Sequence, residues 1–236
     1  MAVRNFRGML GWYRRRWLDL VASIYVYNEH RGYTALDELL AAMRVVTPND
    51  RTFIAQIEQH RADEYKHYLM FKRWFEKRGQ MPLLVDRTCG HIDRFIEIVV
   101  GSRIDDIDTA AMIGDEDNFE KLCRVVALTE RRGYRQVQIL LRHPFVRRDR
   151  HLTKIFEVIR QDEPRHWAPY EGWLKLHQRR GPGWWERWTD LFIHSELLLI
   201  KLPLLFLTPQ LRRRSSWPDE SETAGASRWP QWPLAR

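Results

Sequence analysis

Residues 161–167 read QDEPRHW, a stretch that sets a glutamate and a histidine three positions apart around a proline. In a helix, this spacing places the side chains of Glu163 and His166 on one face. A related stretch, DEYKHY at 63–68, repeats the same spacing. Whether these pairs have a chemical role depends on what the rest of the chain builds around them.

The overall composition is that of a globular protein with an anionic partner. Of the 236 residues, 44% are hydrophobic and 30% charged, and the net charge is +8. A basic chain favours nucleic acid or an acidic membrane, but no nucleic-acid partner is expected because zinc-finger, phosphate-loop and RNA-binding signatures are missing. Cys89 and Cys123 form no CxxC motif and are expected to be reduced thiols. The first residues lack the apolar run of a signal peptide, which favours a cytoplasmic location.

Helical periodicity runs through most of the chain, and strand-like alternation does not persist. The predicted fold class is therefore all-α. Asn49 or Asp50 is expected to cap the second of four long helices. A connecting segment in mid-chain contains a short apolar helix, HIDRFIEIVV, and an acidic loop. The long helices are expected at roughly 16–44, 50–77, 118–142 and 149–180, and the connecting segment at 80–116.

Each expected helix carries an apolar stripe at alternating steps of three and four residues, the pattern of a helix-bundle seam. A glutamate interrupts every stripe near its middle, and in two stripes a histidine follows it. At about 1.5 Å per residue, all four glutamates lie about 20 Å from the nearer interhelical turn, so they can meet at one level of a four-helix bundle. The interrupting residues are Glu29, Glu64, His67, Glu130, Glu163 and His166.

Two short sequences recur in the second half of the chain. EHRGY at 29–33 returns as ERRGY at 130–134, and DEYKHY at 63–68 returns as DEPRHW at 162–167. The offsets, 101 and 99 residues, are nearly equal. We therefore expect a duplicated helical hairpin with approximate two-fold symmetry.

Four carboxylates in a bundle core need compensating positive charge. Each buried, unpaired carboxylate is costly, and clustering adds mutual repulsion. Divalent cations remove this cost, and four carboxylates with two imidazoles suit two ions joined by bridging carboxylates. Hard oxygen ligands with one nitrogen per metal favour iron or manganese, and the ligand types also permit zinc.

This donor set resembles that of the ferritin-like di-iron carboxylate superfamily, which combines one glutamate from each of two helices with Glu-x-x-His from each of two others. The resemblance covers roughly residues 16–180 and implies a ferritin-like bundle with two iron ions, or manganese in their place. The implied assignments are Glu29 and Glu130 as terminal ligands, Glu64 and Glu163 as bridging ligands, and His67 and His166 as one imidazole ligand for each metal.

The residues around each ExxH motif extend the resemblance. Asp63 and Asp162 precede the motifs, one residue off the stripe, where each can accept a hydrogen bond from the histidine of the other hairpin. An ordinary surface charge is the alternative for both. DEPRH also resembles the DExRH signature of di-iron hydroxylases and desaturases, and DEYKH differs by lysine for arginine. Pro164 cannot bond to the Arg160 carbonyl and is expected either to distort the helix or to begin one.

Small and apolar stripe residues predict where a substrate would enter. Gly32 and Gly133, one turn beyond the terminal glutamates, are expected to leave space for O₂ or substrate, or to allow close helix packing. The candidate walls of a substrate channel are Tyr25, Leu36, Phe71, Val126, Val137 and Tyr170.

A tryptophan-rich apolar segment follows the bundle. Residues 184–207 precede an arginine run at 212–214, and internal charges with Pro203 argue against a membrane-spanning helix. We expect this segment and the basic, aromatic N-terminal residues to rest on the inner face of a membrane as a peripheral element. A fifth helix over the bundle or a homodimer contact is the alternative. The predicted divisions are a di-metal bundle at 1–183, the apolar segment at 184–214 and a disordered tail at 215–236.

The architecture resembles that of the demethoxyubiquinone hydroxylases. This resemblance implies an O₂-activating oxidoreductase, of the monooxygenase, oxidase or desaturase type, acting on an apolar, lipid-like substrate. Its electrons would come from a separate reductase or ferredoxin, because the chain carries no flavin or iron–sulfur motif. One alternative is a rubrerythrin-like peroxidase or ferroxidase, although the Cys₄ iron domain is missing. Another is a non-catalytic, membrane-associated scaffold with a structural metal pair.

Overall fold

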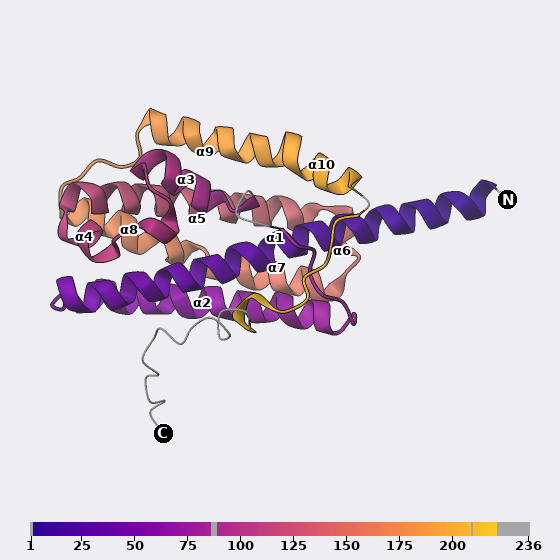
Figure 1. The fold of residues 1–236 in the computed structure, drawn as a ribbon, viewed down its shortest axis with the longest axis horizontal. Coiled ribbons are helices and arrows are strands. Elements are labelled where there is room, and N and C mark those ends of the chain that lie inside the picture. The colour runs from indigo at the N-terminus through magenta and orange to yellow at the C-terminus, as the bar shows by residue number, and fades with distance from the viewer. Residues whose placement is uncertain (1, 86–88, 209, 221–236) are drawn as a thin grey trace, which may run out of the picture.

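A computed structural model describes residues 2–85, 89–208 and 210–220 (Figure 1). Within these ranges the chain is helical apart from loops and one isolated bridge between Leu83 and Arg213, so the predicted all-α class is confirmed. The elements are α1 (Ala2–Val46), α2 (Arg51–Glu76), α3 (His91–Val100), a 3₁₀ turn (Ile104–Asp106), α4 (Thr109–Gly114), α5 (Glu116–Arg142), α6 (Pro144–Arg147), α7 (Arg150–Asp162), α8 (Pro164–Leu176), α9 (Trp184–Glu196), a π-helical turn (Leu197–Lys201) and α10 (Leu202–Leu207).

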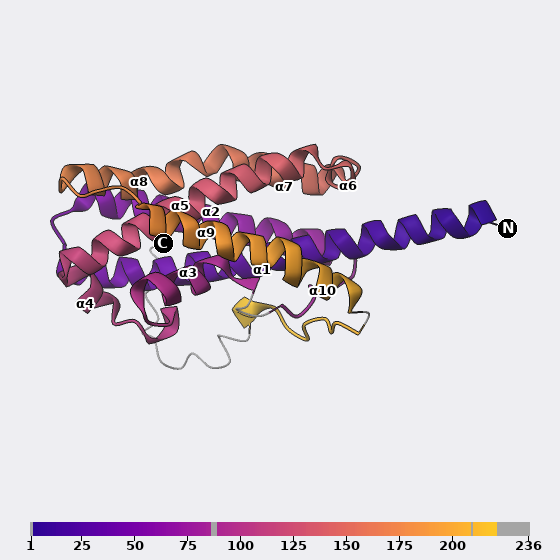
Figure 2. The same cartoon turned by 90° about the horizontal axis from the view of Figure 1, so that it is seen from above.

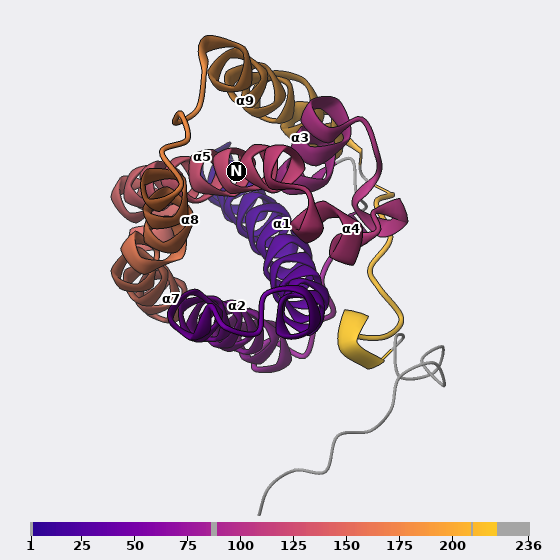
Figure 3. The same cartoon turned by 90° about the vertical axis from the view of Figure 1, so that its left-hand side faces the viewer.

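Four long elements lie side by side and form the helical core: α1, α2, α5 and the end-to-end pair α7–α8 (Figure 3). α1 packs along α2, and α5 packs against α7 and α8. α2 also packs against α7 and α8 and so joins the two groups of helices. Asp50 caps α2 by accepting a hydrogen bond from the Phe53 backbone N–H at 3.2 Å. This cap satisfies one of the free N–H groups at the helix start.

Two apolar clusters fill the helical core. One includes Phe53, Ile57 and Trp173, and the other includes Phe71 and Phe156. Burying a side chain of this size contributes about 1.5–3 kcal/mol, so the two clusters account for much of the driving force that assembles the helices. Along each helix, the buried glutamates and histidines of the stripes lie between residues of one cluster and residues of the other. Apolar packing on both sides therefore holds these polar side chains in the core.

The first helix begins at Ala2, well before the start near residue 16 that the sequence predicts. A glycine costs only about 1 kcal/mol in a helix interior, so Gly8 and Gly11 do not end it. The ring centroids of Trp12 and Tyr13 lie 5.7 and 4.7 Å from that of Phe206, which ties this part of α1 to α10. Figure 1 shows the first turns projecting beyond the helical core.

The expected fourth helix is divided at Glu163. α7 ends at Asp162 and α8 begins at Pro164, because proline has no N–H for the carbonyl of Arg160. Glu163 itself keeps right-handed helical angles (φ −45°, ψ −42°), so the two pieces continue in one direction. Pro164 thus distorts the helix and also begins a new one, without removing Glu163 from the helical core.

The connecting segment packs on the outside of α1 and α5 through α3 and α4. The region predicted as an acidic loop contains α4, whose first turn is capped when Asp108 accepts a hydrogen bond from the Ala111 N–H at 3.0 Å. Asp93 of α3 accepts a 2.9 Å hydrogen bond from Arg31 Nε on α1. These contacts hold the segment against the outside of α1, close to Glu29.

The C-terminal apolar segment forms an additional helical layer. α9, the π-helical turn and α10 run along the outside of α3, α5 and α1 (Figure 2). Thr189, Ile193 and Leu197 form the buried face of this layer. Among the helices described, none combines the length and the apolar character needed to cross a membrane.

The predicted disordered tail begins too early in the sequence. Residues 215–220 pack on α2: Trp217 is only 7% exposed, and Asp219 accepts hydrogen bonds from Tyr68 Oη at 2.7 Å and Lys72 Nζ at 3.0 Å. A buried indole and a paired carboxylate supply contacts that hydrophobicity averaged over the tail does not reveal. The rest of the predicted tail, 221–236, lies outside the described residues.

Candidate metal centre

The six predicted ligands come from α1, α2, α5 and the junction of α7 with α8, and they meet at one level of the helical core. Their donor atoms form two groups in which all atoms lie within 4.8 Å of one another. Glu163 belongs to neither group, but its Oε2 lies 3.9 Å from His166 Nδ1. The groups are Glu29, Glu64 and His67, and Glu64, Glu130 and His166 together with His60.

Glu64 is common to both groups through one oxygen. Its Oε1 lies 3.3 Å from His166 Nδ1 and 4.0 Å from His67 Nδ1. His67 Nδ1 is also 3.3 Å from Glu29 Oε2, and His166 Nδ1 is 3.9 Å from Glu130 Oε2. Two ligand atoms each about 2.1 Å from one ion lie about 3.0 Å apart at a right angle and about 4.2 Å apart when opposite. The spacings therefore suit two ions that share the Glu64 carboxylate.

The histidine nitrogens that face this level have no hydrogen bond. Nδ1 of His67, both ring nitrogens of His166 and Oε2 of Glu163 are buried without a hydrogen-bond partner within the described part of the chain. Each such atom costs about 1–3 kcal/mol. Imidazole nitrogens and carboxylate oxygens are ligands that divalent first-row metals accept. The donor set and its unpartnered atoms thus fit a pair of metal ions.

The far nitrogen of each histidine faces an aspartate of the other ExxH motif. His67 Nε2 lies 2.9 Å from Asp162 Oδ2, and His166 Nε2 lies 3.5 Å from Asp63 Oδ2. Both aspartates are buried, so neither is an ordinary surface charge. A carboxylate at Nε2 favours the tautomer that carries the proton there and leaves the Nδ1 lone pair directed at the centre.

The arginine and lysine of the two motifs hold these aspartates. Arg165 Nε donates to Asp63 Oδ2 at 2.7 Å and also contacts Asp162. Lys66 Nζ lies 2.7 Å from Asp63 Oδ1 and 2.6 Å from Asp162 Oδ2. Burial raises the pKa of the Asp63 carboxyl, but the nearby His166 imidazole and hydrogen bonds from Arg165 and Lys66 outweigh it and hold the pKa well below its usual range. Burial likewise raises the pKa of Asp162, and His67 and Lys66 outweigh it and lower the pKa. Both aspartates therefore stay ionised and available as acceptors.

Burial and crowding of like charges shift the titration of the central side chains. Burial, and then neighbouring carboxylates, raise the pKa of Glu64 and of Glu163. Burial disfavours the charged form of His67 and His166, but adjacent carboxylates outweigh it and raise both pKa values to about 10. Without metal, protons on the histidines thus offset part of the negative charge near neutral pH. A metal ion must displace them, because only neutral imidazole is a ligand.

Gly32 and Gly133 make room for the second glutamate of each hairpin. A Cβ atom on Gly32 would overlap Glu64 Oε2, and one on Gly133 would lie 3.3 Å from Glu163 Oε1. Each glycine lies three residues after a glutamate, Glu29 or Glu130, in the repeated EHRGY and ERRGY sequences. The close approach of a carboxylate therefore gives a physical reason for glycine at both positions.

Gly32→Ala is expected to weaken metal binding and stability more than Gly133→Ala. The new methyl group at position 32 forces Glu64 away, and such overpacking typically costs about 1–3 kcal/mol. At position 133 the Glu163 carboxylate has to shift by only a few tenths of an ångström. The helix preference of alanine, about 0.5–1 kcal/mol, offsets part of the cost in both variants. Metal titration and denaturant unfolding check this order, and equal behaviour of the two variants would contradict it.

His60 is a residue of this level that the sequence patterns do not identify as a ligand. It is 2% exposed, and its Nε2 lies 3.6 Å from Glu64 Oε1 and 3.8 Å from Glu130 Oε1. Its position on the stripe of α2, four residues before Glu64, is the signal in the sequence. The Glu-x-x-His pattern does not include that position.

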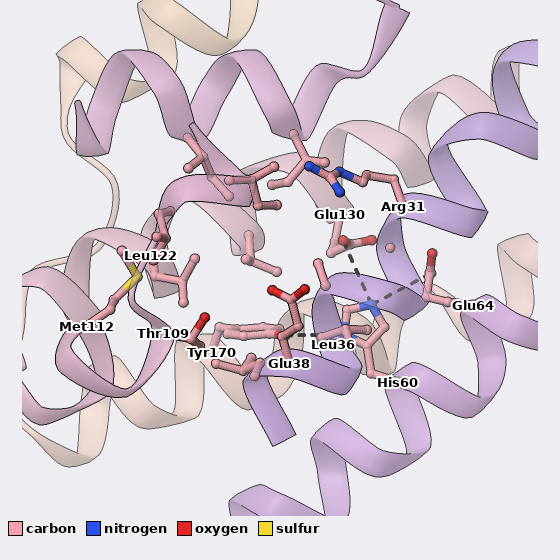
Figure 4. Close-up of a pocket in the computed structure, with 18 residues that line it drawn as sticks. Arg31, Leu36, Glu38, His60, Glu64, Thr109, Met112, Leu122, Glu130 and Tyr170 are labelled. Carbon is pink, nitrogen blue, oxygen red and sulfur yellow. Dashed lines mark hydrogen bonds and ion pairs between the residues drawn. The ribbon is translucent and has the colours of Figure 1, made fainter. Parts of the chain in front are cut away.

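An apolar cavity opens beside these side chains (Figure 4). Its volume is about 90 Å³. His60, Glu64 and Glu130 line one end, and aliphatic side chains line most of the remainder. This end of the cavity gives a small apolar molecule direct access to the carboxylates. Apolar residues of the wall include Leu36, Ile96, Ile107, Met112, Leu122 and Val126.

A second cavity, of about 130 Å³, borders all four glutamates: Glu29, Glu64, Glu130 and Glu163. Tyr25 also lines it, and its buried Oη has no hydrogen-bond partner among the described residues. The carboxylates thus border two cavities. Of the six predicted channel walls, Leu36, Val126 and Tyr170 line the first cavity, Tyr25 lines the second, and Phe71 and Val137 pack in the core.

No protein-family model, curated protein or solved structure matches this chain.

Proposed function

We propose that this chain is an O₂-activating, non-haem di-iron oxidoreductase of the ferritin-like type that oxidises an apolar, lipid-like substrate. The observation that carries the proposal is the pair of buried, unpartnered imidazole nitrogens of His67 and His166 on either side of Glu64 Oε1. Carboxylate oxygens with few imidazoles favour iron, with manganese as the alternative.

A duplicated hairpin within a four-helix bundle accounts for the symmetry of the site. In this proposal α1 with α2 is one copy, and α5 with α7–α8 is the other. Each copy supplies one glutamate, one Asp-Glu-x-x-His run and one glycine against the second glutamate. The crossed contacts of His67 with Asp162 and of His166 with Asp63 are those that a two-fold relation between the copies would produce.

Iron ions, when bound, supply electrons for the activation of O₂. The residues of the chain have three tasks in this reaction. The glutamates balance the charge of the ions, and Asp63 and Asp162 orient the imidazoles. The aliphatic cavity excludes water and binds an apolar substrate beside Glu64 and Glu130. A separate reductase or ferredoxin returns electrons to the centre, since the sequence contains no flavin or iron–sulfur motif.

Oxygen uptake by chemically reduced, iron-loaded protein tests this function. We expect the rate of uptake to rise when an apolar substrate or a lipid extract is added, with an oxygenated or desaturated product. Rapid reduction of peroxide, with O₂ uptake that no lipid extract stimulates, would instead favour the rubrerythrin-like peroxidase or ferroxidase. Metal that stays bound but reacts with neither oxidant would favour the structural scaffold.

We further propose that the outer face of α9 and α10 binds an anionic membrane surface. Trp184 and Leu199 are 77% and 76% exposed on this face. Trp185, Trp188 and Phe192 stack in a row along it, with successive ring centroids 5.6 and 5.5 Å apart. An exposed apolar patch of this kind is typical of an interaction site, and tryptophan is the residue of membrane interfaces.

The N-terminal part of α1 extends the same face. Trp12 and Tyr13 are 49% and 44% exposed and contact Phe206 of α10. Exposed arginines, Arg15 on α1 and Arg187 on α9, accompany these aromatic side chains. Aromatic and basic residues together match the chemistry of an anionic lipid surface.

Flotation with anionic vesicles checks the membrane proposal. The full chain is expected to float with the vesicles, and binding should weaken as salt rises. Changing Trp188 and Leu199 together to serine should abolish flotation, because both side chains are exposed on this face. Serine at Leu176 and Ile139, which are exposed on α8 and α5, is the matched control and should leave binding unchanged. A chain that never floats but elutes as a dimer would assign the face to contact between copies.

A further inference from the structure

The imidazole of His60 points into the metal centre with a spacing that does not suit hydrogen bonds (Figure 4). Its Nε2 lies 3.6 Å from Glu64 Oε1 and 3.8 Å from Glu130 Oε1. Hydrogen bonds from nitrogen to oxygen are about 2.7–3.2 Å long. Two ligands of one ion, each about 2.1 Å from it, are instead about 3.0–4.2 Å apart. His60 therefore has the position of a co-ligand of these carboxylates.

The other ring nitrogen of His60 has a partner of its own. Nδ1 lies 3.3 Å from Oη of Tyr170, whose side chain is fully buried. When Nδ1 carries the ring proton and donates it to Tyr170, the lone pair of Nε2 points at Glu64 and Glu130. Tyr170 thus has the same role for His60 as Asp162 has for His67. Each is an acceptor behind the ring that fixes which ring nitrogen is free to bind metal.

We propose that His60 is a further ligand of the centre, oriented by Tyr170, and that the two halves of the centre therefore differ. The inference rests on the proposed di-metal function. One half contains two imidazoles, which lie close together: the rings of His60 and His166 stack with centroids 4.1 Å apart. The halves are His60, His166, Glu130 and the shared Glu64 on one side, and His67, Glu29 and the shared Glu64 on the other.

The second hairpin has no counterpart of this extra imidazole. Four residues before Glu163, where His60 precedes Glu64, the sequence has Ile159, which is fully buried in an apolar cluster. The added nitrogen therefore breaks the two-fold symmetry of the centre at one metal only. Imidazole raises affinity for the later first-row ions, so the half with two imidazoles is expected to fill first.

The imidazole-rich half is also the one that faces the apolar cavity. His60, Glu64, Glu130 and Tyr170 all line it (Figure 4). A substrate in that cavity meets the metal held by His60 and His166 before it can approach the other. His60 therefore marks the metal position that faces this cavity, whereas Glu29 of the other half borders the second cavity.

Anaerobic titration of the full-length, metal-free protein with Co²⁺, followed by visible absorption, tests the proposal. We expect two binding steps in the wild type. His60→Gln should weaken the first step by more than the roughly 10–100-fold typical of losing an outer-shell partner, and Tyr170→Phe by about 10-fold. Glutamine keeps a polar side chain of similar size but lacks the imidazole nitrogen, so a purely structural histidine would be replaced without loss. His91→Gln, which removes a buried histidine paired with Asp190 at 2.8 Å, is the matched control.

A second measurement does not depend on the folding of any variant. Wild-type protein labelled with ¹⁵N-histidine and loaded with one equivalent of Cu²⁺, a later first-row ion, should show two coupled imidazole nitrogens by pulsed EPR. One coupled nitrogen, or a His60→Gln titration that superimposes on the wild type, would overturn the role of His60 and leave the di-metal centre in place. A wild-type chain that takes up neither Co²⁺ nor Cu²⁺ would remove the proposed function itself.

Discussion

Changing Glu64 and Glu163 together to alanine is expected to reduce the metal content of iron-loaded protein from about two ions per chain to nearly none. Glu64 Oε1 belongs to both donor groups, so its loss removes a ligand from each ion. Glu163 offers a buried, unpartnered oxygen 3.9 Å from His166 Nδ1 and is the remaining carboxylate that can compensate. Metal analysis after desalting measures the effect.

The matched control changes two glutamates on the same helices outside the centre. Glu58 on α2 has a side chain 46% exposed, and Glu157 on α7 has one 42% exposed. Their double alanine variant should keep the wild-type metal content. Unchanged metal in the Glu64 and Glu163 variant, or equal losses in the two double variants, would reject the centre as the place where metal binds.

The effect of the Glu64 and Glu163 double variant on the stability of the protein should have opposite signs with and without metal. Without metal, the buried carboxylates repel one another, so removing two of them relieves repulsion and burial cost. Metal that binds only the folded wild type adds about 4 kcal/mol per site at a thousand times its dissociation constant. The double variant is therefore expected to unfold at equal or higher denaturant concentration than metal-free wild type, and at lower concentration than the metal-loaded protein.

Much of the fold follows from helical periodicity because apolar side chains at steps of three and four must face a common core. The cap at Asp50 and the end of α5 at Arg142 lie where the sequence predicts helix boundaries. The start of α1 does not, because contacts of Trp12 and Tyr13 with Phe206 are tertiary and leave no periodic signal. Trp217 is hidden for the same reason, since a single buried indole cannot be distinguished from one in a polar tail.

The candidate site divides in a similar way. A stripe shows which side chains share one face of a helix, and repeated motifs show which faces correspond. Neither shows how far a side chain reaches across the core. His60 and His67 lie on the same stripe of α2, and only their distances to Glu64, Glu130 and Glu29 assign them to different donor groups. Likewise, Gly32 and Gly133 predict space, but the sequence does not show that the carboxylates of Glu64 and Glu163, from the neighbouring long helix, fill this space.

Glu130→Ala is expected to abolish substrate-stimulated O₂ uptake while leaving the helical circular dichroism signal largely intact. Glu130 lines the apolar cavity and belongs to the donor group that contains His166. Burial disfavours its charged form, but His166 and His60 outweigh this and lower its pKa to about 2, so it stays a carboxylate near neutral pH. Its loss therefore removes a negative ligand at the point where the substrate would meet the centre. Oxygen-electrode traces of reduced, iron-loaded wild type and variant, with and without a lipid extract, measure the effect.

A variant that fills the cavity separates the substrate from the metal. Ala35 lines the cavity and is half-buried, so Ala35→Phe is expected to occupy part of the space while all predicted ligands remain. This variant should keep wild-type metal content and basal O₂ uptake, and lose stimulation by the apolar substrate. Stimulation that survives in Ala35→Phe but not in Glu130→Ala would move the substrate to the second cavity, beside Glu29 and Glu163. Stimulation that survives in both would place the oxidation outside the centre, because the substrate would then depend on neither the carboxylate nor the space next to it.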